Sequence, residues 1–196
     1  TRWIVSVDDH VVEPPDVWTA RIPGRIDEVP HIETFDDGEA WVFGAKKKPI
    51  MNQGGRLFTE ESGLRDLIDV PHYYREMRPG SYDPVERAKD MDVAGVAVSA
   101  CFPSFPRFCG QEFLEHPDRK LGALCVQAYN DWLIDEWCGA APGRYISLII
   151  LPLWDPVAAA IEIERCAAKG AKGITFPENP HPLGLPSVHD IDHYWD

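Results

Sequence analysis

From residue 83 onward, predicted helices alternate with predicted strands along the chain. This alternation constrains the possible folds more strongly than any other feature of the sequence. Asp83-Pro84-Val85 and Asp155-Pro156-Val157 each place an N-cap aspartate before a proline in the first helical turn. Each helix begins a unit that ends in a glycine-led apolar strand, at 95–101 and 173–176. A third strand, 145–151, is almost continuously apolar, as parallel strands covered on both faces are. The pattern predicts an α/β fold with a parallel sheet.

The two helix starts lie 72 residues apart, and two helix–strand steps per repeat are what a (β/α)8 barrel gives. Convergent helix-cap chemistry is the alternative explanation. Another helix begins near Asp118 and ends at Gly139, and residues 3–8 form a first strand. The chain thus offers four parallel strands, whereas a closed barrel has eight. We predict that residues 1–196 are the N-terminal half of one barrel domain, completed by a missing C-terminal half or by a partner chain.

Residues 13–80 differ in character and are predicted to form a cap-like insertion after the first strand. Stretches 31–35, 39–43 and 47–50 are typical of short antiparallel strands. An insertion at this point would emerge at the carboxyl end of a barrel, where such folds carry their active sites. Tyr74 is therefore a candidate substrate-binding residue, as are neighbours such as Met51 and Asn52. Packing of the insertion onto the barrel would explain the same residues.

The first strand, Val5-Ser6-Val7-Asp8-Asp9-His10, changes abruptly from apolar to acidic and imidazole side chains. Alternation along a strand places Asp8 and His10 on the face of Ser6, and Asp9 on the other. A carboxylate and an imidazole on one face suit a divalent metal such as zinc, iron or manganese. The simpler interpretation is a turn-capping aspartate beside a loop histidine.

Polar residues also follow the fourth strand, in Glu178-Asn179-Pro180-His181. Glu178 has the strand parity of Ile174, and a carboxylate there could reach a metal held by Asp8 and His10. Asn179 and His181 are candidate substrate-binding residues at the same strand end. Each has a plain alternative as a loop residue.

Charge and cysteine content limit the partners. The net charge of −13 argues against nucleic acid and anionic membranes as partners. The partner expected instead is a small-molecule substrate. Lys46-Lys47-Lys48 is the only basic run and is interpreted as a solvated hairpin edge. The five cysteines are odd in number and contain no Cys-x-x-Cys pair, which favours a reducing cytoplasm over a disulfide framework. No apolar run approaches the length of a membrane span.

Four segments together resemble the amidohydrolase-related family, in the branch of aminocarboxymuconate semialdehyde decarboxylase and resorcylate decarboxylases. They are residues 7–18, Asn130-Asp131-Trp132, 145–152 and 170–174. The resemblance implies the first half of a distorted TIM barrel with a divalent metal at its carboxyl end. The family's acid-or-histidine, any residue, histidine motif maps onto Asp8 and His10, and its bridging carboxylate maps onto Glu178. The remaining ligands, and the acid or base, have no counterpart in this chain.

On this basis we expect a metal-dependent hydrolase that attacks an amide, ester or lactone through a metal-activated water. Non-oxidative decarboxylation of an aromatic or enoic acid is the first alternative. A non-catalytic subunit that completes a barrel with a partner is the second. An oligomer is expected, and no catalytic acid or base can be named.

Overall fold

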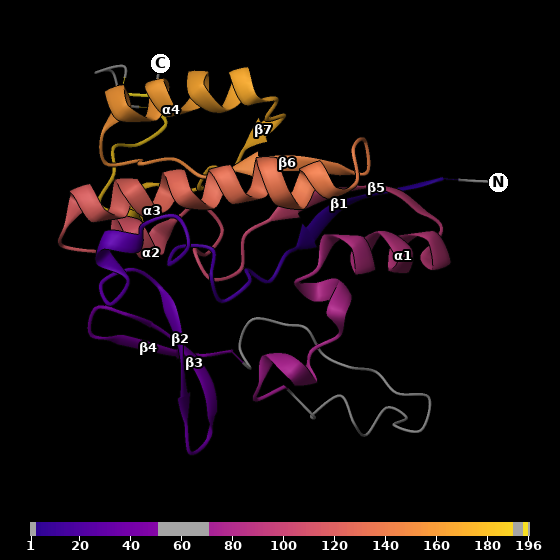
Figure 1. Cartoon of the computed structure of the whole chain (residues 1–196). Coiled ribbons are helices and arrows are strands. Elements are labelled where there is room, and N and C mark those ends of the chain that lie inside the picture. Colours follow the sequence, from indigo (N-terminus) through magenta and orange to yellow (C-terminus); the bar gives the residue numbers. More distant parts are fainter. Residues whose placement is uncertain (1–2, 51–70, 190–193, 196) are drawn as a thin grey trace.

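The computed structural model describes residues 3–50, 71–189 and 194–195. Its main sheet has four parallel strands in the order β1-β5-β6-β7 (Figure 1). Their bounds are β1 Ile4–His10, β5 Val96–Phe102, β6 Tyr145–Ile149 and β7 Gly173–Ile174. The predicted α/β class and all four parallel strands are confirmed. The predicted residues Met51 and Asn52 lie outside the described part of the chain.

The helices between these strands are α1 Pro84–Ala94, the short α2 Gln111–Leu114, α3 Arg119–Asp131 and α4 Pro156–Lys169. Three of them, α1, α3 and α4, begin where the sequence predicts, whereas the short α2 was not predicted. The side chains of Asp83, Asp118 and Asp155 accept backbone N–H groups of the first turns of α1, α3 and α4. After Asp131 the α3 helix continues as a π-helical segment, Trp132–Cys138. Single 3-10 turns lie at Pro23–Arg25, Tyr74–Glu76, Pro79–Ser81 and His181–Leu183.

One face of the main sheet packs on the helices. Cys101 of β5 and Tyr145 of β6 lie in one buried cluster with Trp137, and Ile149 lies in a second with Cys166 of α4. Strand β1 is different, because Ile4, Val5 and Val7 are 53%, 54% and 72% exposed. Among the described residues, the first strand therefore lacks the cover that its neighbours have.

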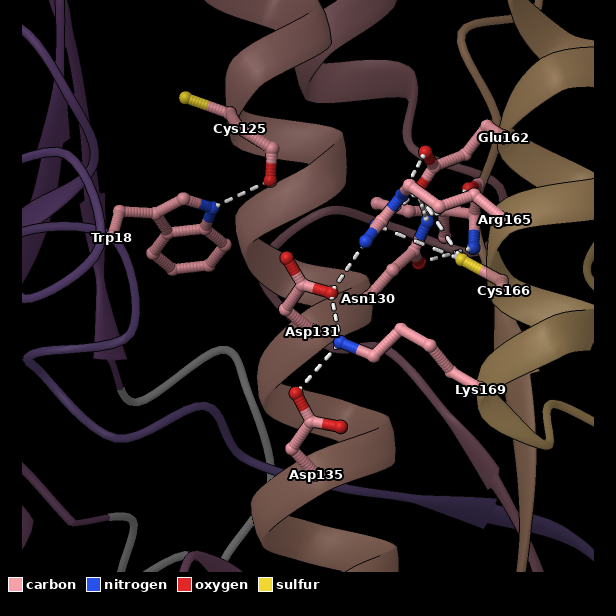
Figure 2. Close-up of polar contacts among 10 residues, drawn as sticks. Trp18, Cys125, Asn130, Asp131, Asp135, Glu162, Arg165, Cys166 and Lys169 are labelled. Carbon is pink, nitrogen blue, oxygen red and sulfur yellow. Dashed lines mark hydrogen bonds and ion pairs between the residues drawn. The ribbon is translucent and has the colours of Figure 1, made fainter.

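A buried asparagine joins the helix layer to the end of β6. Asn130 of α3 donates from Nδ2 to the carbonyl of Ile150 (2.9 Å) and accepts the Ile150 N–H at Oδ1 (3.0 Å). The same Nδ2 also donates to Glu162 of α4 (2.8 Å), which forms an ion pair with Arg165 (Figure 2). Asn130 thus makes the bonds that a neighbouring strand would make, at the point where β6 ends.

The predicted insertion strands are also confirmed. They form an antiparallel sheet of β2 His31–Phe35, β3 Gly38–Phe43 and β4 Lys46–Pro49. Trp41 and Phe43 of β3 pack on Phe105, whose ring centroid lies 4.8 Å from that of Trp41. The small sheet is therefore fixed to the segment that follows β5. Whether residues 13–80 act as a cap stays a prediction.

The lysine run lies on β4, an edge strand of the small sheet, with Lys46 and Lys47 exposed as interpreted, but two of its lysines also form long-range ion pairs. Lys48 and Lys46 form ion pairs with Glu112, whose side chain is 1% exposed, and Lys46 also pairs with Glu115 at 2.6 Å. These contacts, 64 to 69 residues apart in sequence, connect β4 to α2 and the residue after it. A buried carboxylate attracts the lysines, which sequence alone does not show.

No helix in the described part of the chain combines the length and the apolar character needed to cross a membrane.

Candidate functional site

The end of β1 contains a bulge that sets the direction of its acidic residues. Ser6 pairs with Ser99 and Asp9 with Cys101, so β1 has one extra residue between these pairs. Ser99 donates from its hydroxyl to the Asp9 carboxylate, which directs Asp9 to the helix-covered face. Simple alternation from Ser6, which predicts that Asp8 shares its face, fails across the bulge. Asp8 lies within the bulge, between the paired residues Ser6 and Asp9, whereas His10 follows Asp9 in regular register and alternates to the opposite face.

His10 is held by the loop after β5. Its Nδ1 donates to the carbonyl of Pro103 (2.9 Å), and its ring centroid lies 5.9 Å from that of Phe102. Arg87 of α1 donates to the His10 carbonyl (3.0 Å). Because a carbonyl can only accept, Nδ1 carries the proton and the neutral ring has its lone pair on Nε2. This is the arrangement of a histidine that binds a metal through Nε2.

A pocket of about 600 Å³ lies at the carboxyl ends of β5 and β7. Its lining combines two aromatic rings with polar side chains: Phe108, Gln111, Phe176, Pro177, Glu178, Asn179, Pro182 and Leu183. The Phe108 ring stacks on Phe102 at 4.8 Å with an interplanar angle of 19°, and Phe102 contacts His10. A continuous row of rings therefore leads from His10 to the pocket.

The structure separates the other predicted residues from this pocket. Tyr74 lies in the hydrophobic core, 9% exposed, and its hydroxyl donates to the Glu13 carbonyl (2.7 Å). His181 is exposed in the turn that follows, where its N–H donates to the side chain of Asn179 (3.3 Å). Neither side chain lines the pocket, whereas Glu178 and Asn179 do.

Sequence reasoning missed Glu13, three residues after His10. Its side chain is fully buried, and its carboxylate accepts the N–H groups of Ser104 and Phe105, both at 2.9 Å. Burial raises the pKa of Glu13 to about 7, against the opposing effect of these backbone hydrogen bonds. Phe108 and Gln111 were also missed. The signal for Phe108 was the aromatic and proline-rich loop 103–108, placed directly after a strand, whereas Gln111 lies beyond that loop and had no such signal.

The donor chemistry of Asp8 and His10 fits a divalent metal, since a carboxylate and an imidazole with its lone pair on Nε2 are both present. Within the described ranges, no group of three His, Cys, Asp or Glu side chains gathers closely enough to hold a metal. The structure therefore places Asp8 and His10 at the end of β1 and Glu178 in the pocket, without uniting the three as a ligand set.

Comparison with known proteins identifies the family. A model of the amidohydrolase family matches residues 16–196. Over 50 residues, 26% of this chain and 15% of the relative, the chain is 42% identical to gamma-resorcylate decarboxylase of Rhizobium radiobacter. The structure resembles an amidohydrolase from Mycobacterium avium subsp. paratuberculosis K-10, with a TM-score of 0.67 and 23% identity over 88% of this chain and 48% of that one.

A 2,6-dihydroxybenzoate decarboxylase from Rhizobium matches with a TM-score of 0.47 and 19% identity, over 89% of this chain and 38% of that one. The chain thus spans less than half the length of each of these relatives. Its parallel strands and helices form part of a TIM barrel. The match over residues 16–196 shows that this chain belongs to the amidohydrolase family, as its sequence predicts.

Proposed function

We propose that this chain supplies the N-terminal half of a metal-dependent enzyme that decarboxylates an aromatic acid without oxidation. The observation that carries the proposal is the row of rings from His10 through Phe102 to Phe108, which opens into the pocket with Glu178 and Asn179. Aromatic rings pack well on such surfaces in offset or tilted contact. The local likeness to gamma-resorcylate decarboxylase supports the same substrate class.

The pocket residues would bind and orient the substrate. Phe108 and Phe176 would pack on its ring. The side-chain oxygen Oε1 of Gln111 already accepts the Cys109 N–H (2.9 Å), so its side-chain nitrogen Nε2 is the end that can donate to a substrate carboxylate. In the reaction, the bond between ring and carboxyl carbon breaks, its electron pair stays on the ring carbon, carbon dioxide leaves and a proton takes its place.

Asp8 and His10 would hold the divalent metal, whether zinc, iron or manganese, with Glu178 as a third or bridging ligand. When bound, such a metal stabilises negative charge that develops on a substrate oxygen. The remaining ligands and the proton donor are proposed to come from the missing C-terminal half or a partner chain.

Hydrolysis of an amide, ester or lactone is the second candidate, and the family model, whose description is amidohydrolase, favours it. A non-catalytic subunit that needs a partner chain is the third, favoured by the exposed apolar side chains of β1. Five unpaired cysteines, four of them buried, support our placement of the protein in the cytoplasm.

Metal content measured on the purified chain after loading with zinc, iron or manganese tests the site. We expect at least a tenfold loss in His10→Ala and in Asp8→Asn. Asp9→Asn and His31→Ala are matched controls that keep their metal. Asp9 is hydrogen-bonded to Ser99, and both ring nitrogens of His31 are used, Nδ1 by the carbonyl of Val29 and Nε2 by Glu33. Unchanged metal in both His10→Ala and Asp8→Asn would make the motif structural.

Product analysis tests the reaction, with the chain alone and with its completing half or partner. We expect release of labelled carbon dioxide from carboxyl-labelled hydroxybenzoates, and a KM at least tenfold higher in Phe108→Ala. Cleavage of aryl esters or anilides without carbon dioxide release would establish hydrolysis instead. Neither reaction from a completed, metal-loaded assembly would favour the non-catalytic subunit.

A further inference from the structure

Glu13 connects the segment after β1 to the loop after β5. Both oxygens of its fully buried carboxylate are used, Oε1 by the Ser104 N–H and Oε2 by the Phe105 N–H. Pro103, the residue before Ser104, has no backbone N–H. The amides of Ser104 and Phe105 are therefore the first backbone donors through which this loop can be held. A carboxylate that accepts two adjacent backbone N–H groups fixes the position of that peptide segment.

The peptide held in this way also contacts His10. The carbonyl that accepts His10 Nδ1 belongs to Pro103, the residue directly before Ser104. The backbone of Glu13 is also held in place, because its carbonyl accepts a hydrogen bond from the Tyr74 hydroxyl. The Val11 N–H donates to the Phe102 carbonyl (2.9 Å) and aligns the two segments. Residues 10–13 therefore provide both His10 and the Glu13 carboxylate, and this carboxylate positions the Pro103 carbonyl that accepts from His10.

We propose that Glu13 is a positioning residue that keeps His10 protonated on Nδ1 and so presents Nε2 toward the open face. It acts through the Ser104 and Phe105 amides and the Pro103 carbonyl, and it does not touch the proposed substrate or metal. The inference rests on the proposed role of His10 as a ligand. A metal-binding histidine keeps one tautomer when its other ring nitrogen donates to a fixed acceptor, and here that acceptor is the Pro103 carbonyl.

The burial of Glu13 supports this role. Its pKa is raised because the carboxylate is removed from water, and the described structure places two backbone amides at it instead of a cation. Buried ionisable groups with shifted pKa values gather at functional sites. Purely structural anchoring of the loop is the competing explanation, and it makes no demand on the tautomer of His10.

The experiment observes the imidazole directly, in chain labelled with 15N-histidine, by long-range 1H–15N correlation at pH 8 without metal. In the wild type we expect the His10 pattern of a ring protonated on Nδ1. In Glu13→Gln, an NH2 group faces one of the two amides, and the ratio of the two His10 tautomers should fall at least twofold. Glu162→Gln, which changes another buried glutamate, should leave the ratio unchanged.

A second measurement, zinc affinity by chelator competition, should show at least fivefold weaker binding in Glu13→Gln and none of this loss in Glu162→Gln. If Glu13→Gln does not fold by circular dichroism, Glu13→Asp, one methylene shorter, takes its place with the same expected shift. An unchanged tautomer ratio in a folded variant, or an equal shift in Glu162→Gln, overturns the proposal. A shifted tautomer in a chain that binds no zinc supports the positioning role and counts against the proposed function alone.

Discussion

Two buried glutamates secure the carboxyl ends of neighbouring strands in different ways. Glu13 holds the loop after β5 through two backbone amides. Glu162 acts at the end of β6 through Asn130 and is held by both guanidinium nitrogens that Arg165 directs at it, each at 2.8 Å (Figure 2). Both side chains are almost completely buried. The difference lies in the charge that faces each carboxylate.

That difference gives the two groups opposite pKa shifts. Burial raises the pKa of Glu13 to about 7, because the backbone hydrogen bonds only partly offset the loss of water. Burial acts on Glu162 in the same direction, but hydrogen bonds from Arg165 and Asn130 outweigh it and lower its pKa. A facing cation therefore decides which protonation state burial favours. The surroundings of Glu162 stabilise its negative charge. The surroundings of Glu13, next to the proposed site, disfavour the charged form of its carboxyl group.

The largest effect is expected when the asparagine that links Glu162 to β6 is removed. Asn130→Leu leaves the buried N–H and carbonyl of Ile150 without their bonds, and each such group costs about 1 to 3 kcal/mol. We expect the free energy of unfolding to fall by about 4 kcal/mol, measured by urea denaturation. Asn179→Leu is the control, since Asn179 is exposed and should change stability by less than about 0.5 kcal/mol. A cost below about 1 kcal/mol for Asn130→Leu would show that Ile150 finds other bonds.

The next effect tests the raised pKa of Glu13. Because the folded chain holds this proton up to about pH 7 and the unfolded chain only to about 4.5, the folded state binds more protons between these values. The stabilising contribution is therefore complete below pH 4.5 and is lost as the pH rises through 7, by about 3 kcal/mol. Glu13→Gln should remove this decline when unfolding is followed from pH 5 to pH 8. An identical decline in the variant would assign it to another group.

Glu162 should show the opposite slope. Because the pKa of Glu162 is lowered in the folded state, the unfolded state binds this proton first as the pH falls. The stabilising contribution of the Glu162 carboxylate is therefore present above about pH 4.5 and is lost as the pH falls through the lower pKa of the folded state. Glu162→Gln removes the pair with Arg165, which keeps Asp131 as a partner, and we expect a loss of about 2 kcal/mol at pH 7. The deficit relative to wild type should shrink in unfolding measurements toward pH 3. A constant deficit would contradict the assigned direction.

The comparison also separates what the sequence can predict from what it cannot. The helix caps at Asp83 and Asp155 were predictable because capping depends on residues within one turn. Glu13 and its amide partners lie 91 and 92 residues apart, and the bulge in β1 depends on its register with β5. The position of Glu178 and Asn179 in a pocket lining was predictable because polar residues after a strand are a local signal, and their roles stay predictions. The core position of Tyr74 was not visible in its own segment.

The smallest effect is expected at the rim of the Glu162 region, and it separates exposed from buried charge. Lys169 of α4 pairs with Asp131 and, at 2.6 Å, with Asp135, and its side chain is 28% exposed. Water and salt reach this pair, so Lys169→Met should cost only about 0.5 kcal/mol in urea denaturation at low salt. The cost should vanish at 0.5 M sodium chloride, because the Debye length is then shorter than in dilute buffer and exposed charges are screened from one another. Lys89→Met, on exposed α1, is the control without measurable loss. The loss of stability in Glu162→Gln should persist at 0.5 M sodium chloride, because the Glu162 carboxylate is buried. Equal salt sensitivity of Lys169→Met and Glu162→Gln would mean that burial does not distinguish the two ion pairs.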